Sequence, residues 1–235
     1  MPGTRPAQTD EFSRALHSKL VGVPRYAKET KKMRVSPSVL LASIAATFLT
    51  PYGMAHFKLI EPASWIQEDQ RGDPQKAGPC GGTNGDPGKP SEAVTNVQGG
   101  AKLHVRVRET IFHPGFYRIA LAVNSLDELP RDPVPVTVES PNGPRSVSGA
   151  IQYPFIPPVL ADGLWQHISR ADTEFETDIE IPNINCSKCI LQIIEFMANH
   201  GLNKPGDFTY HHCAVLQIRS NPDKPIDSRF PAEKK

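Results

Sequence analysis

The chain has 235 residues and a net charge of +1, with 38% hydrophobic and 7% aromatic residues. This length suits one main folded core with appendages, and 24 prolines with 17 glycines favour short strands and loops over a helical bundle. Because no basic stripe is interleaved with aromatic residues, nucleic acid is not an expected partner.

The first 55 residues divide into two segments. Residues 1–32 are polar and mixed in charge, and we interpret them as an over-called start, that is, an N-terminus assigned upstream of a true start at Met33. The stretch from Lys31 to Ala55, of which residues 33–55 form the expected signal peptide, has basic residues, then an apolar run from Val39 to Leu49 and then small residues, which is the form of a secretory signal peptide. The apolar run is short for a bilayer span, so a membrane anchor is the weaker alternative and no stable membrane insertion is expected after cleavage. Cleavage between Ala55 and His56 would deliver the protein to the periplasm or outside the cell.

The segment 56–220 has the periodicity of β-strands. In 101–112 (AKLHVRVRETIF), apolar residues at 103, 105 and 107 alternate with His and Arg, which indicates one buried and one wet face. Further strand candidates, separated by proline and glycine, are 116–123, 134–140, 175–184, 189–198 and 213–220. This pattern predicts an all-β fold, an immunoglobulin-like or fibronectin-III-like β-sandwich with long loops, followed by a flexible tail at 221–235.

Four cysteines are present: Cys80, Cys186, Cys189 and Cys213. An even number in an exported chain favours two disulfides, for which three pairings are possible. Cys186 and Cys189 are close enough to pair across a tight turn, which would leave Cys80 to join Cys213. The alternative is a zinc or redox CxxC motif, although zinc would require a second pair of ligands and no second CxxC is present.

His56 becomes the first residue if cleavage follows Ala55. Its α-amino group and its imidazole would then offer two nitrogen ligands from one residue, and a second imidazole would complete a T-shaped three-nitrogen site. Nitrogen-rich tetragonal geometry suits Cu(II), which also has the highest affinity among first-row divalent metals. His56 is therefore a candidate ligand for one copper ion, Cu(II)/Cu(I).

His113 is the candidate second imidazole. It follows a predicted strand and precedes Pro114 and Gly115, which places it in a turn where side chains from different elements can converge. The alternative is an ordinary loop histidine. The presence of a histidine at the processed N-terminus favours the ligand interpretation.

Several motifs occur in the order seen in lytic polysaccharide monooxygenases and their copper-binding relatives. These are HFKLIEPASW from residue 56, CGG from 80, HPGFYRIAL from 113, CSKCILQI from 186 and YHHCAVLQI from 210. The chain therefore resembles this superfamily over nearly all of the segment that follows the signal. The resemblance implies one copper ion held by a histidine brace, formed by His56 and His113, that activates oxygen or peroxide to oxidise a glycosidic C–H bond.

The resemblance also implies roles for other residues. Tyr210, in the Y-x-x-C motif, matches the axial tyrosine of fungal cellulose-active members, and the alternative is a packed strand aromatic. Glu195 matches an acid/base group, and the alternative is a solvent-facing carboxylate. His212 is a candidate for orienting bound oxygen, because His211 and His212 are adjacent in a strand and face opposite sides. Phe208 replaces a glutamine of the fungal pattern.

The expected substrate is a chitin-like or cellulose-like polysaccharide, and turnover would require an external electron donor. Candidates for a sugar-stacking face, by residue type alone, are Trp65, Tyr153, Phe155 and Trp165. Two alternative functions are a copper-binding or copper-delivery protein without oxidative turnover, and a non-catalytic chitin-binding protein.

Overall fold

The structure is a computed structural model that describes residues 56–170 and 172–234. Residues 1–32, interpreted above as an over-called start, and the predicted signal peptide 33–55 lie outside the described residues. The described part contains ten strands and a single 3-10 turn, η1 (Leu126–Glu128), and none of its helical structure is long and apolar enough to cross a membrane. The strands are β1 (His56–Glu61), β2 (Val94–Gln98), β3 (Lys102–Ile111), β4 (Gly115–Ala122), β5 (Pro135–Ser140), β6 (Gly143–Gly149), β7 (Val159–His167), β8 (Glu174–Glu180), β9 (Cys186–Met197) and β10 (Thr209–Arg219).

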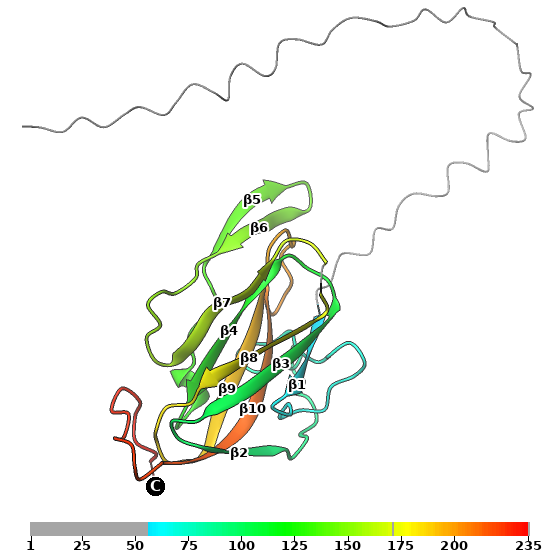
Figure 1. Cartoon of the computed structure of the whole chain (residues 1–235). Helices are drawn as coiled ribbons and strands as arrows, with labels where there is room; N and C mark the ends of the chain where they lie inside the picture. Colours follow the sequence, from blue (N-terminus) through cyan, green and yellow to red (C-terminus); the bar gives the residue numbers. More distant parts are fainter. Residues whose placement is uncertain (1–55, 171, 235) are drawn as a thin grey trace, which may run out of the picture. The chain divides into compact units, whose positions relative to one another are not determined.

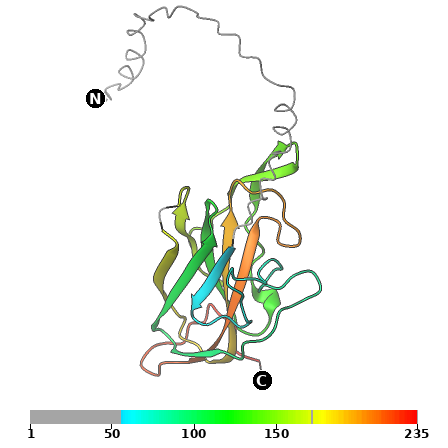
Figure 2. The same ribbon diagram turned by 90° about the vertical axis from the view of Figure 1, so that its right-hand side faces the viewer.

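The fold is an all-β sandwich, as the sequence predicts. A three-stranded sheet in the order β1-β3-β8 lies against a five-stranded sheet in the order β2-β10-β9-β4-β7 (Figure 1). All neighbours in these two sheets are antiparallel except β2 and β10, which are parallel. A hairpin of β5 and β6 forms a third sheet, which projects beyond the sandwich (Figure 2).

The core lies between the two larger sheets. Along β3, burial alternates as predicted, with Leu103, Val105 and Val107 turned inward and the intervening positions more exposed. The central strands β4, β9 and β10 are buried along almost their whole length, which explains their near-continuous runs of apolar residues. The inward row of β3 continues to Glu109, so a carboxyl group lies where the pattern calls for an apolar side chain.

Both favoured disulfides are present, Cys80–Cys213 and Cys186–Cys189. The first joins the long loop after β1 to the middle of β10. The same loop is held there by backbone and side-chain hydrogen bonds, since the Trp65 amide donates to the Cys213 carbonyl at 2.8 Å and Trp65 Nε1 donates to the Cys80 carbonyl at 3.0 Å. This loop, which carries Asp73 and Gln75, is therefore fastened to the five-stranded sheet.

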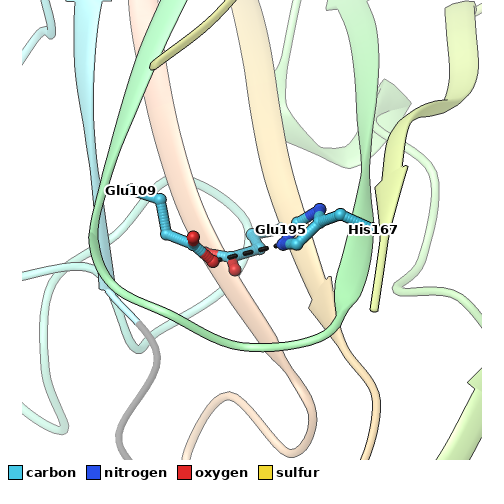
Figure 3. A group of neighbouring side chains, drawn as sticks. All are labelled: Glu109, His167 and Glu195. Carbon is cyan, nitrogen blue, oxygen red and sulfur yellow. Dashed lines mark hydrogen bonds and ion pairs between the residues drawn. The ribbon is translucent and has the colours of Figure 1, made fainter. Parts of the chain in front are cut away.

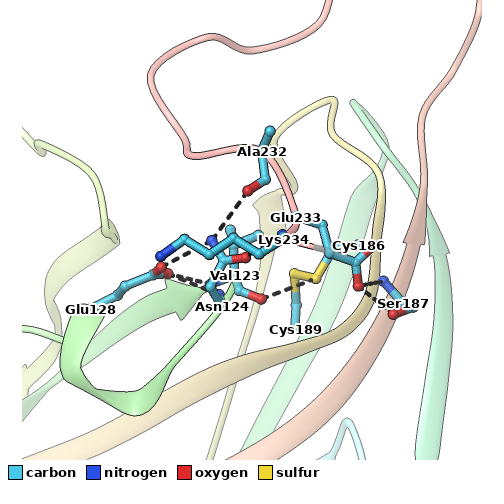
Figure 4. The surroundings of a disulfide bond; sticks show 9 residues. All are labelled: Val123, Asn124, Glu128, Cys186, Ser187, Cys189, Ala232, Glu233 and Lys234. Atoms are coloured by element: carbon cyan, nitrogen blue, oxygen red, sulfur yellow. Dashed lines mark hydrogen bonds between the residues drawn. A yellow bond between two sulfur atoms is a disulfide. The ribbon is translucent and has the colours of Figure 1, made fainter.

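The segment after β10, expected to be a flexible tail, is attached to the sandwich. Phe230 is only 7% exposed and belongs to the main core cluster. Beside the Cys186–Cys189 disulfide, Glu233 accepts a hydrogen bond from the Ser187 amide at 2.9 Å, and the Lys234 amide donates to Asn124 at 2.7 Å (Figure 4). In the sequence, the feature that points to this packing is Phe230, an aromatic residue among prolines and charged residues.

Candidate metal centre

Strand pairing brings His56 and His113 to the same end of the three-stranded sheet. β1 and β3 are antiparallel, and His56 at the start of β1 lies opposite Ile111 at the end of β3. His113 follows only two residues later, in the turn that leads into β4. The register of one strand pair therefore places the two predicted copper ligands at one edge of the sandwich.

The five-stranded sheet contributes Tyr210 to the same end. β4 begins at Gly115 opposite Met197 near the end of β9, and Tyr210, the second residue of β10, lies opposite Glu195. The ring of Tyr210 meets the ring of His56 edge-on, with 5.2 Å between the ring centroids. The structure thus brings His56 and Tyr210, which are more than 150 residues apart in the chain, into direct contact.

His56 is fully buried, and its ring is oriented by a carboxylate. Nε2 of His56 lies 3.0 Å from Oδ2 of Asp73, and this hydrogen bond is the main reason why the pKa of Asp73 lies below its usual value. The next residue is fixed as well, because the Phe57 amide donates to Oε1 of Gln75 at 3.1 Å. Since an ionised Asp73 accepts a proton from Nε2, Nδ1 is the ring atom that could join the α-amino group in a chelate.

Replacing Asp73 by asparagine is expected to weaken copper binding by the processed protein about 10-fold to 100-fold, because the carboxylate that orients a ligating imidazole is lost. Competitive copper titration measures the change. The matched control is Asp178→Asn, since Asp178 makes a 3.0 Å hydrogen bond to the exposed His104 on the surface of the sandwich. Equal affinity in the Asp73 and Asp178 variants would show that Asp73 does not position His56 for a metal.

The contacts of His113 orient its ring so that Nε2 is the nitrogen atom that could bind a metal. Nδ1 of His113 lies 3.0 Å from the Phe112 carbonyl, and its backbone amide donates to Oε1 of Glu109 at 2.9 Å. Burial, together with the neighbouring His200, lowers the pKa of His113 to about 4. The imidazole is therefore neutral at neutral pH, as a metal ligand must be, with the proton on Nδ1 and the lone pair on Nε2.

A third histidine, which no sequence motif indicates, lies beside His113. The ring of His200 is 4.6 Å from that of His113, centroid to centroid. Ser146 of β6 fixes its backbone, since the His200 amide donates to Oγ of Ser146 at 3.1 Å and the Ser146 amide donates to the His200 carbonyl at 2.9 Å. Only the fold therefore reveals the proximity of His200 to the candidate metal centre.

Tyr210 is buried and hydrogen-bonded. Nδ2 of Asn203, in the loop between β9 and β10, donates to the Tyr210 hydroxyl at 3.1 Å. Burial and the nearby carboxylates Asp73 and Glu195 raise the pKa of Tyr210 above its usual value, so the phenol stays protonated at neutral pH. The hydroxyl group is thus a neutral polar group beside His56.

Glu195 lies in the core between two tyrosines. In the five-stranded sheet it is opposite Tyr117 on one side and Tyr210 on the other, and it is completely buried. The alternative interpretation, a solvent-facing carboxylate, is therefore wrong. Burial first, and the charge of Glu109 second, raise the pKa of Glu195 well above its usual value. Its role as an acid/base group stays a prediction.

His211 and His212 point to different partners, as strand geometry requires. Nε2 of His211 lies 2.8 Å from Oδ1 of Asp132, whereas Nε2 of His212 lies 3.0 Å from the Phe57 carbonyl and Nδ1 of His212 lies 3.1 Å from Oε1 of Glu68. Burial lowers the pKa of His212 to about 4 and raises that of Glu68 to about 7. The imidazole of His212 is therefore neutral at neutral pH, and the buried Glu68 carboxyl group beside it keeps its proton to a higher pH than an exposed carboxyl group does.

His212 thus supports the backbone of the residue that follows His56. The carbonyl group it contacts belongs to Phe57, whose ring packs edge-on against the His212 ring with centroids 4.6 Å apart. His212 therefore acts on the candidate metal centre through Phe57. Its predicted role in orienting bound oxygen stays a prediction.

The buried Glu68 carboxyl group gives a pH-dependent prediction. Its pKa is raised in the folded state, so its contribution to stability is full below the unfolded value of 4.5 and is lost as the pH rises through about 7. Glu68→Gln removes this loss, and the free energy of unfolding of the variant should rise relative to the parent between pH 4.5 and 7, by at most about 3 kcal/mol. Urea denaturation across this range measures it, and a constant difference would contradict it.

Three of the four aromatic candidates for a sugar-binding face lie away from His56 and His113. Trp165 packs into the core against Tyr117 and Phe175, and Tyr153 and Phe155 line a surface pocket of about 490 Å³ together with Glu180. Glu180 pairs with Lys102 at the opposite end of β3 from Ile111. These aromatic side chains therefore do not form a platform beside His56 and His113.

Phe208, which stands where the fungal pattern has glutamine, is part of the core. It is 5% exposed and packs in a cluster with Phe116 and Phe196. Gly149 leaves the space for this cluster, because a Cβ atom there would lie 2.9 Å from the Phe196 ring. Phe208 is thus a packed core residue.

Comparisons with known proteins give a structural likeness but no match in sequence. No family model and no curated protein matches the chain. The solved structure of "Lytic Polysaccharide Monooxygenase AA15 from Thermobia domestica in the Cu(I) State" is similar over 70% of this chain and 99% of that chain, with 16% sequence identity and a TM-score of 0.47. At this level of similarity, the function of the present chain depends on its own residues.

Proposed function

We propose that cleavage between Ala55 and His56 yields a secreted or periplasmic copper protein, and that it functions as a polysaccharide monooxygenase. His56, through its α-amino group and Nδ1, and His113, through Nε2, would hold one copper ion. Tyr210, whose ring packs against that of His56, would lie beside the ion. Bound copper would supply one-electron redox chemistry towards oxygen or peroxide, with electrons from an external donor.

The observation that carries this proposal is the orientation of the two imidazoles. Asp73 contacts Nε2 of His56, and the Phe112 carbonyl contacts Nδ1 of His113. The ring atom that can close a chelate with an α-amino group is Nδ1, so Asp73 engages the other atom. Both contacts thus set the tautomers that a brace of three nitrogens requires.

The surrounding residues of the chain would prepare this site before any metal arrives. Gln75 and His212 fix the two backbone groups of Phe57, and Glu109 accepts a hydrogen bond from the His113 amide. The neutral Tyr210 hydroxyl adds a polar group without adding charge. Because these groups are buried and hydrogen-bonded, ligand binding would require little reorganisation.

Copper titration with electron paramagnetic resonance tests the copper site. The protein beginning at His56 is compared with the same protein carrying one extra residue before His56 and with the His113→Ala variant. We expect one copper ion per chain with a nitrogen-rich axial spectrum for the first protein, and loss of both properties in the other two. Equal weak binding by all three proteins would contradict the proposal.

A copper-binding or copper-delivery protein on the same fold is the second candidate. It is favoured by the location of the aromatic residues, since Tyr153 and Phe155 line a pocket at the other end of β3. Copper delivery requires a brace but no sugar-binding face. The third candidate, a non-catalytic chitin-binding protein, requires such a face but no metal.

Mass spectrometry of a glycan panel separates these candidates. The processed protein is loaded with copper and incubated with each glycan, a reductant and peroxide, with the His113→Ala protein as the control. Oxidised oligosaccharides formed by the processed protein alone would support the monooxygenase. Firm copper binding without product from any glycan would leave copper delivery, whereas a metal-independent pull-down on chitin would favour the third candidate.

A further inference from the structure

A second cluster of metal-ligating side chains lies inside the sandwich. Glu109, His167 and Glu195 each offer one ligand atom, and these three atoms lie within 4.8 Å of one another (Figure 3). The side chains of Glu109 and Glu195 are fully buried, and that of His167 is 10% exposed. None of these residues is a ligand of the copper site proposed above.

The cluster is built from both sheets. Glu109 comes from β3 of the three-stranded sheet, whereas Glu195 comes from β9 and His167 ends β7 in the five-stranded sheet. The three side chains point toward one another across the interior (Figure 3). The two facing sheets fix the spacing of these ligand atoms. This spacing does not depend on a flexible loop.

The hydrogen bonds of His167 leave a charge to be balanced. Nδ1 of His167 lies 2.7 Å from the Trp165 carbonyl, which can only accept, so Nδ1 carries a proton. Nε2 lies 3.2 Å from Oε1 of Glu109. A lone pair on Nε2 would face a carboxylate oxygen, so either a second proton or a cation must lie between them.

Three of the four carboxyl oxygens of Glu109 and Glu195 lack a hydrogen bond of good geometry among the described residues. Both oxygens of Glu195 and Oε2 of Glu109 are buried without a hydrogen bond of good geometry among the described residues, and so is the Tyr117 hydroxyl. Glu109 and Tyr117 are still near enough to Glu195 to affect its pKa. Two adjacent buried carboxyl groups are costly unless a proton or a cation compensates them.

We propose that Glu109, His167 and Glu195 form a binding site for one divalent first-row transition cation. One imidazole and two carboxylates form a mixed nitrogen and oxygen donor set that suits Zn²⁺, Mn²⁺ or Fe²⁺. A divalent cation neutralises both carboxylates and occupies the space between Nε2 of His167 and Oε1 of Glu109. The Nδ1 contact to the Trp165 carbonyl orients the imidazole for this purpose.

The spacing is compatible with such a cation. Metal bonds to imidazole nitrogen and carboxylate oxygen are about 2.0–2.2 Å long, so two ligand atoms of one ion are at most about 4.3 Å apart. The 3.2 Å between His167 and Glu109 lies within this limit, and the 4.8 Å bound for the whole cluster exceeds it only slightly.

A route from solvent leads to His167. Its side chain helps to line a surface pocket of about 290 Å³ between β6 and β7, together with Gln166 and Phe196. The other two ligands lie further inside. A cation would therefore enter at the exposed edge of the imidazole and then reach the carboxylates.

Zinc titration of a protein without the copper brace tests this inference independently of the proposed function. The protein carries one extra residue before His56 and His113→Ala, and binding of Zn²⁺ alone is followed by calorimetry and by the melting temperature. We expect one Zn²⁺ per chain and a higher melting temperature. Addition of Glu195→Gln or, separately, His167→Gln is expected to weaken zinc binding more than about 100-fold, since a ligand is lost.

The surface cluster of His104 and Asp178 provides the control, because Asp178→Asn removes an exposed carboxylate next to a histidine and should leave zinc binding unchanged. Circular dichroism identifies any variant that fails to fold, and the two single variants are read separately. A folded parent that binds no zinc, or zinc affinity that is equal in the parent and in a folded Glu195→Gln or His167→Gln variant, would overturn the inference. X-ray absorption of the zinc-loaded parent should show one imidazole among oxygen ligands, and coordination by two or more imidazoles would also overturn it.

Discussion

Removal of the Cys80–Cys213 disulfide, by Cys80→Ala with Cys213→Ala, is expected to lower the free energy of unfolding by about 3–5 kcal/mol. The two cysteines are 133 residues apart, so the bond closes a very long loop, for which the chain-entropy relation gives about 5 kcal/mol. Both cysteines are buried, and alanine introduces no unsatisfied polar group. Denaturation of the processed protein by guanidinium chloride measures the change.

The Cys186–Cys189 bond is the control for this prediction. It spans only three residues, and the same relation gives about 2 kcal/mol for its removal. Removal of Cys80–Cys213 should also weaken copper binding, because the loop it fastens carries Asp73, which contacts His56. Equal losses of stability in the two double variants would show that loop closure is not the main contribution of the long-range bond.

Gly72→Ala is expected to cost about 2–5 kcal/mol and to weaken copper binding. Gly72 has a φ angle of +99°, and a Cβ atom there would lie 1.9 Å from the Phe57 carbonyl oxygen. Strain in the backbone contributes about 1–2 kcal/mol, and steric overpacking contributes a further ~1–3 kcal/mol. The displaced carbonyl is the one that His212 contacts, and Asp73 follows directly in the chain. Both supports of His56 would therefore move.

Gly85→Ala separates the two contributions. Gly85 has a similar φ angle of +84°, but a Cβ atom there meets nothing within 4 Å. Its substitution should cost only the backbone strain of about 1–2 kcal/mol and leave copper affinity unchanged. Urea denaturation and copper titration of both variants measure the difference. A Gly72 variant that matches the Gly85 variant in both measurements would contradict the steric argument.

The strands that could be predicted from the sequence are those with a clear alternation or a long run of apolar residues. Residues 101–112 alternate cleanly, and 189–198 and 213–220 form long apolar runs, so β3, β9 and β10 are visible in the sequence. β7 is not, because it contains a buried Asp162, a left-handed Gly163 and an irregular register with β4. Its polar residues are satisfied locally, since Asp162 accepts hydrogen bonds from the amides of Gln152 and Gly163.

The residues of the candidate site also fall into two groups, those that sequence motifs indicate and those that only the fold reveals. His56, His113 and Tyr210 each lie in one of the motifs that carry the resemblance, and strand register places them at one end of the sandwich, while their roles at a metal stay predictions. Asp73 and His200 lie in loops without a distinctive pattern, and only the folding of those loops places them beside His56 and His113.

The interior acid cluster is hard to predict for another reason. Glu109 continues an alternating strand, where its position in the row indicates that it points inward, yet a carboxylate at such a position is usually taken as an exposed residue. The alternative interpretation of Glu195 as solvent-facing rests on the same grounds. Charge is a poor guide to exposure where two facing sheets bring acidic residues and a histidine together.

The attachment of the C-terminal segment has a consequence for the order of events during synthesis. β10 lies between β2 and β9 in the five-stranded sheet, and Phe230, which follows β10 in the chain, belongs to the core cluster. The five-stranded sheet and its core are therefore complete only once β10 and Phe230 have been made. Because β2 and β9 both pair with a strand that follows them in the chain, a polypeptide truncated before β10 would expose apolar strand edges and would be prone to aggregation.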